Sequence, residues 1–192
     1  MRTVDEVCVK AYTDEALMAM VRDGDVARLG LLFERHQRRI HGFIYRLIGD
    51  PSQSEDLVQE VFFRLLEYRA SYRDEVPFLP WFFRIARNVC NDHFRADKGR
   101  EQPAEEGDES WETPDPMGDL CHQWDLATLE KAFAALPTEK REVLLLSRFE
   151  GLKYQQIAEM SGVSVSAIKV RVHRALEELR TRFRELWQEQ AS

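Results

Sequence analysis

Residues 80–98 read PWFFRIARNVCNDHFRADK and hold the most distinctive mixture of side chains in the sequence. The segment interleaves four aromatic residues with four cations, namely Trp81, Phe82, Phe83 and Phe94 with Arg84, Arg87, Arg95 and Lys98. Aromatic rings stack on unpaired bases, and Arg and Lys neutralise phosphates, so this composition suits binding to single-stranded nucleic acid. An amphipathic helix with a solvated basic face gives the same pattern. The segment alone favours this second interpretation, and the rest of the chain decides whether it holds.

Other residue types that often carry chemistry are too scattered in the sequence to predict a site. Cys8, Cys90 and Cys121 lie far apart without a C-x-x-C pair, so they predict neither a disulfide framework nor a zinc site. Asp119 and His122 form one D-x-x-H pair at helical spacing, but no second pair completes a metal site. We therefore expect neither a metal nor another cofactor.

The formal net charge of −7 argues against a nucleic-acid partner until its distribution along the chain is considered. Residues 99–125 contain nine acids and one base, a local charge of −8, which leaves +1 on the rest of the chain. Within that rest, residues 164–184 hold six bases against two acids. Most of the acidity therefore belongs to one segment.

The acidic segment is also rich in proline and poor in apolar residues, as in REQPAEEGDESWETPDPMGD. Such a composition cannot build a core, so residues 98–124 are predicted to form a flexible linker between domains at residues 13–97 and 125–184. No run approaches about 18 consecutive apolar residues, and the first ten residues lack the apolar run of a signal peptide. We expect a cytoplasmic protein without membrane insertion.

Apolar residues recur at helical spacing throughout the first domain, and no alternating strand pattern of useful length is present. Thr13 is a predicted N-cap, a long helix then follows over residues 26–49, a third helix starts at about Ser54, and a fourth starts at Pro80. The predicted class is all-α, with two small helical domains.

The third helix has a clear apolar stripe and an outward face of different character. Spacing of three to four predicts that one set is buried, namely Leu57, Val58, Val61, Phe62, Leu65 and Leu66. The opposite face presents Asp56, Gln59, Glu60, Phe63 and Glu67. A Phe among acids can anchor a partner, but single exposed aromatics are common. The pattern does not decide between these two interpretations.

The second domain contains a helix-turn-helix pattern. Helices are predicted at residues 138–149, at 154–161, and from a Ser164 cap to about Arg184. The step AEMSGVSVSAIK joins the last two through Gly162, as in motifs whose second helix enters the DNA major groove. A basic helix that only caps a bundle is the alternative.

The outward face of this last helix is predicted from its apolar stripe. If Ile168, Val172, Ala175 and Leu179 pack inward, the residues left to face DNA are Ser166, Ala167, Lys169, Val170, Arg171, His173 and Arg174. The capped N-terminus favours a phosphate, Arg and Lys can donate to guanine, and small apolar side chains can contact thymine methyl groups.

Both domains resemble one family, the extracytoplasmic function (ECF) group of bacterial sigma factors. The stretch LPTEKREVLLLSRFEGLKYQQIAEMSGVSVSAIKVRVHRALEELR resembles their domain 4. DPSQSEDLVQEVFFRLLE followed by PWFFRIARNVCNDHFR is similar to their domain 2. The order and spacing agree, and the resemblance covers about residues 13–184. It implies a promoter-specificity subunit, without catalysis of its own, that binds core RNA polymerase and directs transcription initiation.

The resemblance also implies partners for named residues. Domain 2 would dock on the clamp helices of the largest polymerase subunit through Asp56, Gln59, Glu60 and Phe63. Domain 4 would sit on the flap of the second-largest subunit and read −35 duplex DNA through Ser164, Ser166, Ala167, Lys169, Val170, Arg171 and Arg174. The linker would thread towards the RNA exit path. Family members are often held by an anti-sigma factor, which is therefore a further expected partner.

The family reads the −10 element as a melted strand with one base flipped into a pocket. The matching positions are the loop at residues 70–79, with Tyr72, and Ile85 and Asn88 on the helix. Beside them, the strand would meet Trp81 and the basic residues Arg84, Arg87, Arg95 and Lys98 of the same helix. On a helical projection, the core side would hold Phe82, Ala86, Val89 and Cys90. Trp81, Ile85, Asn88 and Asp92 would lie at the boundary, where an unstacked base needs a stacking surface and an amide.

Four features depart from the family pattern. The loop before the fourth helix reads EVPFLP where small or basic residues are usual, which bears on base selection at −10. Ala167 and Val170 stand where Thr and Ser are usual, which removes hydroxyls from the DNA face. Lys153 replaces the usual Ser or Thr cap before Tyr154, which bears only on the local helix start.

Three other interpretations make different demands on the sequence. A response-regulator activator needs an α/β receiver, and no such strands are predicted before residue 136. A metal-dependent helical-bundle enzyme using Asp56, Glu60, His36 and His41 needs paired Glu-x-x-His motifs, which the sequence lacks. An adaptor that binds only protein does not need the basic strip from Arg84 to Lys98.

Overall fold

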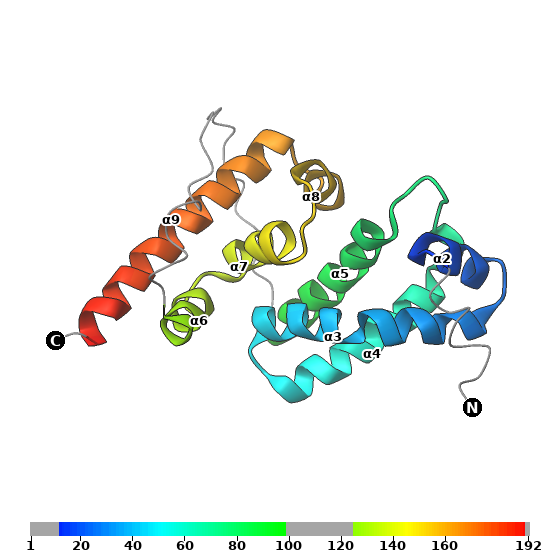
Figure 1. Cartoon of the computed structure of the whole chain (residues 1–192), viewed down its shortest axis with the longest axis horizontal. Helices are drawn as coiled ribbons and strands as arrows, with labels where there is room; N and C mark the ends of the chain where they lie inside the picture. Colours follow the sequence, from blue (N-terminus) through cyan, green and yellow to red (C-terminus); the bar gives the residue numbers. More distant parts are fainter. Residues whose placement is uncertain (1–11, 99–124, 191–192) are drawn as a thin grey trace. The chain divides into compact units, whose positions relative to one another are not determined.

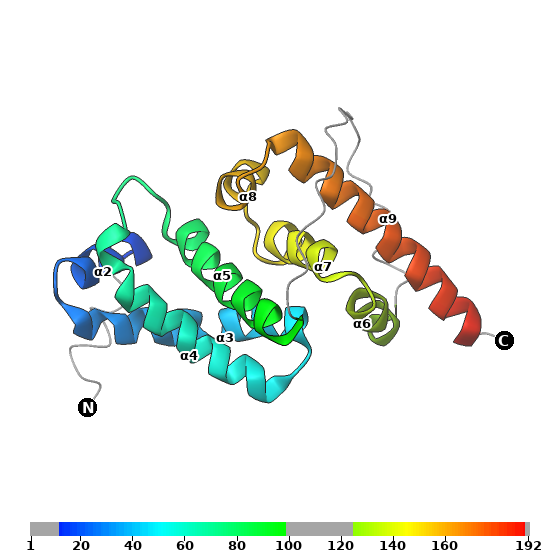
Figure 2. The ribbon, with the colours of Figure 1, turned by 180° about the vertical axis from the view of Figure 1, so that it is seen from behind.

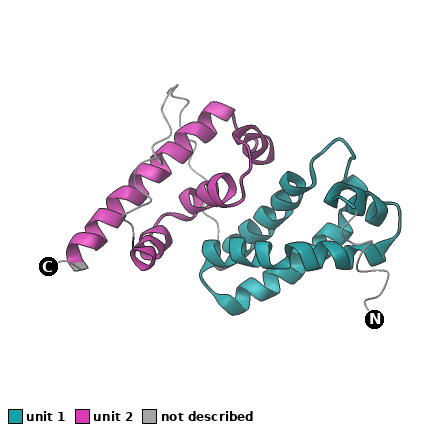
Figure 3. Cartoon of the chain, viewed as in Figure 1, with its two compact units in different colours: residues 1–101 teal, residues 102–192 magenta. Residues whose placement is uncertain are grey.

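The computed structural model describes residues 12–98 and 125–190, which belong to two compact units within residues 1–101 and 102–192 (Figure 3). No strand occurs in the described ranges, and both units are built from helices. The prediction of an all-α protein with two small helical domains is confirmed. The predicted linker lies outside the described residues except for Lys98, the last residue of the final helix of unit 1.

Unit 1 is a bundle in which α3 and α4 lie side by side and α5 packs on α4 (Figures 1 and 2). Its elements are α2 (Asp14–Arg22), η1 (Val26–Arg28), α3 (Leu29–Ile48), α4 (Pro51–Glu67), η2 (Arg69–Ser71) and α5 (Phe78–Lys98). Thr13 caps α2 as predicted, because its Oγ1 accepts a hydrogen bond from the Ala16 amide. Gly49 ends α3 in the left-handed conformation, with φ of 87°.

Two helices of unit 1 begin earlier than predicted. α4 starts at Pro51 instead of Ser54, because Asp50 Oδ1 accepts from the Gln53 amide and proline suits the first helical turn. α5 starts at Phe78 instead of Pro80. Here the carboxylate of Glu15 in α2 accepts from the Phe78 amide at 3.1 Å and satisfies a free helix N–H from a distant part of the chain.

A cluster of aromatic rings from α5, joined by Phe62 of α4, forms part of the core of unit 1. Phe82 is fully buried, with its ring centroid 5.2 Å from that of Phe62 and 5.1 Å from that of Phe78. Burying one such side chain contributes about 1.5–3 kcal/mol. The predicted core side of α5 is confirmed, since every member is buried, namely Phe82, Ala86, Val89 and Cys90.

Unit 2 is built around its long last helix. Its elements are α6 (Leu126–Ala134), α7 (Thr138–Leu144), η3 (Leu145–Phe149), α8 (Tyr154–Ser161) and α9 (Val165–Gln190). The bounds of α8 are those predicted, and α7 with the π-helical turn η3 fills the predicted 138–149 helix. α6, capped by Asp125, was not predicted as a separate helix.

α9 extends beyond its predicted end at Arg184. Phe183 is buried, and Trp187 stacks on it one turn later with ring centroids 5.9 Å apart, so apolar contacts continue along the helix. At its other end, Gly162 closes α8 with φ of 70° and leads into the Ser164 cap. No helix in the described parts of the chain is long and apolar enough to cross a membrane.

Candidate nucleic-acid interface

A hollow of about 590 Å³ lies on unit 1 between one face of α5 and the end of α4. Its walls are formed by Arg64, Tyr68, Ser71, Trp81, Arg84, Ile85, Asn88, Asn91, Asp92 and Arg95. The α5 members recur every three to four residues, so one helical face supplies most of the lining. The hollow combines an apolar surface, two amides and three cations with a single carboxylate.

Five of the eight residues predicted to bind the −10 strand line this hollow, namely Trp81, Arg84, Ile85, Asn88 and Arg95. Trp81 and Ile85 are each 4% exposed and form its floor, whereas Arg84 and Asn88 are exposed. Arg87 is half-buried and does not contribute to the lining. The side chain of Lys98 lies outside the described residues.

Tyr72 does not line the hollow as predicted, because its side chain is only 2% exposed. Its hydroxyl donates to the Val76 carbonyl at 2.9 Å, and its ring lies 5.1 Å from that of Trp81. Burial raises the pKa of this phenol to about 12. Tyr72 therefore supports the floor from beneath. The tyrosine that lines the hollow is instead Tyr68, which directly follows α4 and is 47% exposed.

The hollow also contains an ion-pair network that connects α4 with α5. Arg64 Nε donates to Glu60 Oε1 at 2.7 Å, and Arg64 Nη1 donates to Asp92 Oδ2 at 2.6 Å. Arg95 Nη1 lies 3.8 Å from the other Asp92 oxygen. Hydrogen bonds to Asp92 and Glu60 raise the pKa of Arg64, so its guanidinium is a fixed positive charge.

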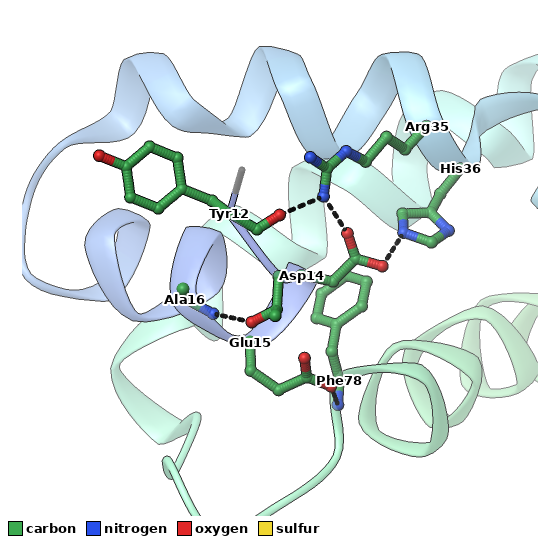
Figure 4. Close-up of polar contacts among 8 residues, drawn as sticks. Tyr12, Asp14, Glu15, Ala16, Arg35, His36 and Phe78 are labelled. Atoms are coloured by element: carbon green, nitrogen blue, oxygen red, sulfur yellow. Dashed lines mark hydrogen bonds and ion pairs between the residues drawn. The ribbon is translucent and has the colours of Figure 1, made fainter. Parts of the chain in front are cut away.

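The N-terminus of α2 fixes the place where α5 begins (Figure 4). Asp14 uses both carboxylate oxygens, one accepting from Arg35 at 2.6 Å and the other 2.7 Å from His36 Nε2. The buried His36 ring lies 5.3 Å from that of Phe78, whose amide is bonded to Glu15. α2 therefore positions the first turn of α5, which carries Trp81, one of the two floor residues of the hollow.

The outward face of α4 carries the four residues predicted to contact polymerase. Asp56 and Gln59 are exposed, Glu60 is half-buried, and Phe63 is 65% exposed. On the opposite face Val58, Val61, Phe62 and Leu65 are buried, while Leu57 and Leu66 are half-buried. α4 thus presents an exposed aromatic ring among carboxylates.

In unit 2, the start of α9 presents polar and basic side chains. Ser164 Oγ accepts from the Ala167 amide at 3.1 Å, which confirms the predicted cap. Ser166, Lys169 and Arg174 are exposed, and Ala167, Val170 and Arg171 are half-buried. The predicted inward stripe is buried in full, namely Ile168, Val172, Ala175 and Leu179. His173 lies 3.2 Å from Glu177 on the same helix.

α8 begins at Tyr154 without a Ser or Thr cap. Gln156 Oε1 accepts from the Lys153 amide at 2.9 Å, which satisfies the N-cap backbone in place of a side-chain hydroxyl. With Lys153 at the N-cap, α8 therefore begins at Tyr154, the residue at which it was predicted to begin. Within residues 12–98 and 125–190, no cluster of three or more His, Cys, Asp or Glu residues could hold a metal ion.

Comparison with known proteins assigns each unit to a described family. Sigma-70 region 2 matches residues 32–100, and Sigma-70, region 4 matches residues 126–179. The RNA polymerase sigma factor CarQ of Myxococcus xanthus is 30% identical over 172 residues, which cover 88% of this chain and 97% of that protein.

A second relative is the ECF RNA polymerase sigma-E factor of Haemophilus influenzae, 29% identical over 185 residues, or 91% of this chain and 97% of the relative. Among solved structures, the sigma factor RpoE in complex with the anti-sigma factor NepR from Bartonella quintana aligns with a TM-score of 0.58 and 25% identity. That alignment covers 81% of this chain and 94% of the RpoE chain.

Proposed function

Because this chain belongs to the ECF group of RNA polymerase sigma factors and so serves promoter-directed transcription initiation, we propose how its parts divide that task. Residues 13–97 bind core RNA polymerase and the melted −10 strand. Residues 125–184 read the −35 duplex, and residues 98–124 link the two. The observation that carries the proposal is the hollow on α5.

The hollow offers each kind of contact that an unstacked nucleotide needs. Trp81 and Ile85 provide an apolar floor, and Tyr68 an exposed ring, on which a base can stack. Asn88 supplies an amide for the base edge, and Arg84 supplies a cation for the adjoining phosphate. A helix whose basic face only contacts water has no need of a hollow lined by apolar side chains such as Trp81 and Ile85. This favours strand binding over the simpler interpretation of the same segment.

Core polymerase would bind the outward face of α4. Phe63 supplies the exposed aromatic anchor, and Asp56, Gln59 and Glu60 surround it with polar and acidic groups. Aromatic anchors ringed by polar residues dominate the energetics of many interfaces. In keeping with the family, we assign this face to the clamp helices of the largest subunit. The flap of the second-largest subunit would receive unit 2.

The first turns of α9 would enter the major groove at −35. Ser164 and Ser166 lie where the free amides of the helix start can hold a phosphate, while Lys169, Arg171 and Arg174 carry the positive charge. Arg171 is the residue we assign to a base edge, and the methyl groups of Ala167 and Val170 suit thymine. This assignment rests on the buried inward stripe, which leaves these side chains facing outward.

Two further expectations follow from family membership. A sigma factor works with core polymerase and DNA, so we expect this protein to act in the cytoplasm. We also expect an anti-sigma factor that covers these same surfaces as a partner; the similar sigma factor RpoE was solved in complex with the anti-sigma factor NepR.

Run-off transcription with core polymerase on a panel of promoters tests the proposal. We expect at least one promoter to be transcribed only when this protein is present, and a stable complex with core on gel filtration. Asn88→Ala should reduce transcription without loss of the complex, whereas the control Arg38→Ala, which removes an exposed arginine of α3 outside the hollow, should not. Absence of both transcription and complex would overturn the proposal.

A further inference from the structure

Arg64 belongs to both proposed binding surfaces of unit 1. Its Nε donates to Glu60, one of the carboxylates on the outward face of α4, at 2.7 Å. Its Nη1 donates to Asp92, a wall of the hollow, at 2.6 Å. A single guanidinium therefore joins an acid of the polymerase-facing surface to an acid of the strand-binding surface.

Asp92 is an unexpected residue in a site for nucleic acid. It is the one carboxylate among the described residues that line the hollow, and its side chain is 49% exposed. An uncompensated charge there would repel the phosphates of a strand. Arg95 is too far from Asp92 for a hydrogen bond, at 3.8 Å, so Arg64 is the closer source of compensation.

The charge on Arg64 is shared, because Glu60 competes with Asp92 for it. Glu60, Arg64 and Asp92 together carry a net charge of −1, and the mostly exposed Arg95, 3.8 Å from Asp92, is a weaker partner at the edge of this group. Glu60 is 42% exposed, and Asp56 lies one turn earlier on the same face of α4, so this surface suits a basic partner. A partner cation that pairs with Glu60 would bring the local charge to zero and leave Arg64 to Asp92.

We propose that Arg64 couples polymerase binding to strand binding by this exchange of ion pairs. In the free protein, Arg64 is held between Glu60 and Asp92, so the charge of Asp92 in the wall of the hollow is only partly compensated by Arg64. In the complex, a cationic side chain of polymerase engages Glu60, Arg64 compensates Asp92, and the hollow accepts the strand more readily. The inference rests on the proposed function, since it takes α4 as the polymerase-facing helix and the hollow as the strand site.

For a strand phosphate taken to lie about 10 Å from the charge that is removed, Coulomb's law gives the size of the effect. Between the effective dielectric constants of water and of a protein surface, the affinity changes by about two- to fifteenfold. An ion pair that only ties α4 to α5 would produce no such effect when Glu60 alone is neutralised. That difference separates coupling from a purely structural role.

The test uses the whole 192-residue chain, alone and with saturating core polymerase. The probe is a fluorescein-labelled DNA single strand from the −10 region of a promoter that the run-off assay identifies. Fluorescence anisotropy at low salt measures strand affinity. We expect core to raise the affinity of wild type. We expect free Glu60→Gln to bind the strand about two- to fifteenfold more tightly than free wild type, with a smaller further gain on adding core.

Arg64→Gln should weaken strand binding in both states, and Arg64→Gln/Asp92→Asn should restore it, because the second change removes the uncompensated acid. Lys140→Gln is the matched control, since it breaks the 2.7 Å Lys140–Glu178 pair in unit 2 and should leave strand binding unchanged. Thermal unfolding of each variant shows whether the fold is kept.

Two outcomes are decisive and distinguishable. If free Glu60→Gln binds the strand no better than free wild type, or if the Asp92→Asn change fails to rescue Arg64→Gln, the coupling role of Arg64 is overturned while the sigma-factor function stands. If wild type with core binds neither the strand nor the promoter, the proposed function itself fails.

Discussion

Phe62 and Phe63 are neighbours on α4, and substitution by alanine should affect a different property of the protein at each position. Phe62 is 6% exposed and its ring lies 4.9 Å from that of Phe33 and 5.2 Å from that of Phe82. Phe63 is 65% exposed on the outward face. Phe62→Ala should therefore affect stability, and Phe63→Ala should affect polymerase binding.

The magnitudes follow from these exposures. Truncating a buried Phe typically costs about 3–5 kcal/mol, which would lower the melting temperature of a domain this size by more than about 10 °C. Phe63→Ala removes a ring that is already mostly in water, so its cost in stability should stay within about 0.5–1 kcal/mol. As the aromatic anchor of an interface, the same ring should contribute about 2 kcal/mol or more to affinity for core, roughly a thirtyfold change in Kd.

The assay combines thermal unfolding by circular dichroism with titration of core polymerase into labelled protein. Phe63→Ala should unfold near the wild-type temperature and bind core at least about tenfold more weakly. Phe62→Ala serves as the internal comparison because it removes the same atoms one residue away. Wild-type affinity for core in a folded Phe63→Ala protein would refute the assignment of this face to polymerase.

Four further substitutions test other parts of the account. Arg171→Ala should cost about 1–3 kcal/mol of promoter affinity and relax preference only in the −35 element; equal loss on all −35 sequences in a gel-shift series would make it a phosphate contact. Tyr68→Ala should weaken binding of the −10 strand by about 1–3 kcal/mol without loss of stability, whereas Tyr72→Ala should destabilise unit 1, as anisotropy and thermal unfolding would reveal. Donation from Lys140 and Arg182 lowers the pKa of Glu178, so its stabilising contribution is present at neutral pH and is lost as pH falls below about 4.3. Unfolding curves of wild type and Glu178→Gln should thus differ at pH 7 and converge in acid, and a constant difference would contradict this.

Local signals in the sequence predicted much of the fold. The bounds of α8 and the Ser164 cap came from a turn glycine and a capping residue only a few positions apart. The core side of α5 followed from helical periodicity, because Ala86 lies four positions after Phe82, and Val89 and Cys90 lie three and four positions after Ala86. The errors at helix starts have a different origin. The start of α5 depends on Glu15, which is far away in sequence and contacts Phe78 only in the folded domain.

The hollow was only partly predictable for a similar reason. The face of α5 with Arg84 and Asn88 is visible in the sequence, but Arg64 and Tyr68 join it only because α4 packs beside α5. Tyr72 was assigned to the site because it lies in the loop that matches the family's −10 recognition loop. In the structure its hydroxyl is satisfied by Val76 and its ring is covered, which no local pattern indicates.

Promoter opening at the −10 element tests the central claim most directly. With 2-aminopurine placed in the −10 region of an activated promoter, fluorescence reports unstacking of the strand as the complex of core and this protein forms. We predict that wild type gives a large increase and that Asn88→Ala gives a much smaller one at equal occupancy of core. An increase of wild-type size with Asn88→Ala, at the same promoter occupancy, would contradict the claim that the hollow on α5 holds the melted strand.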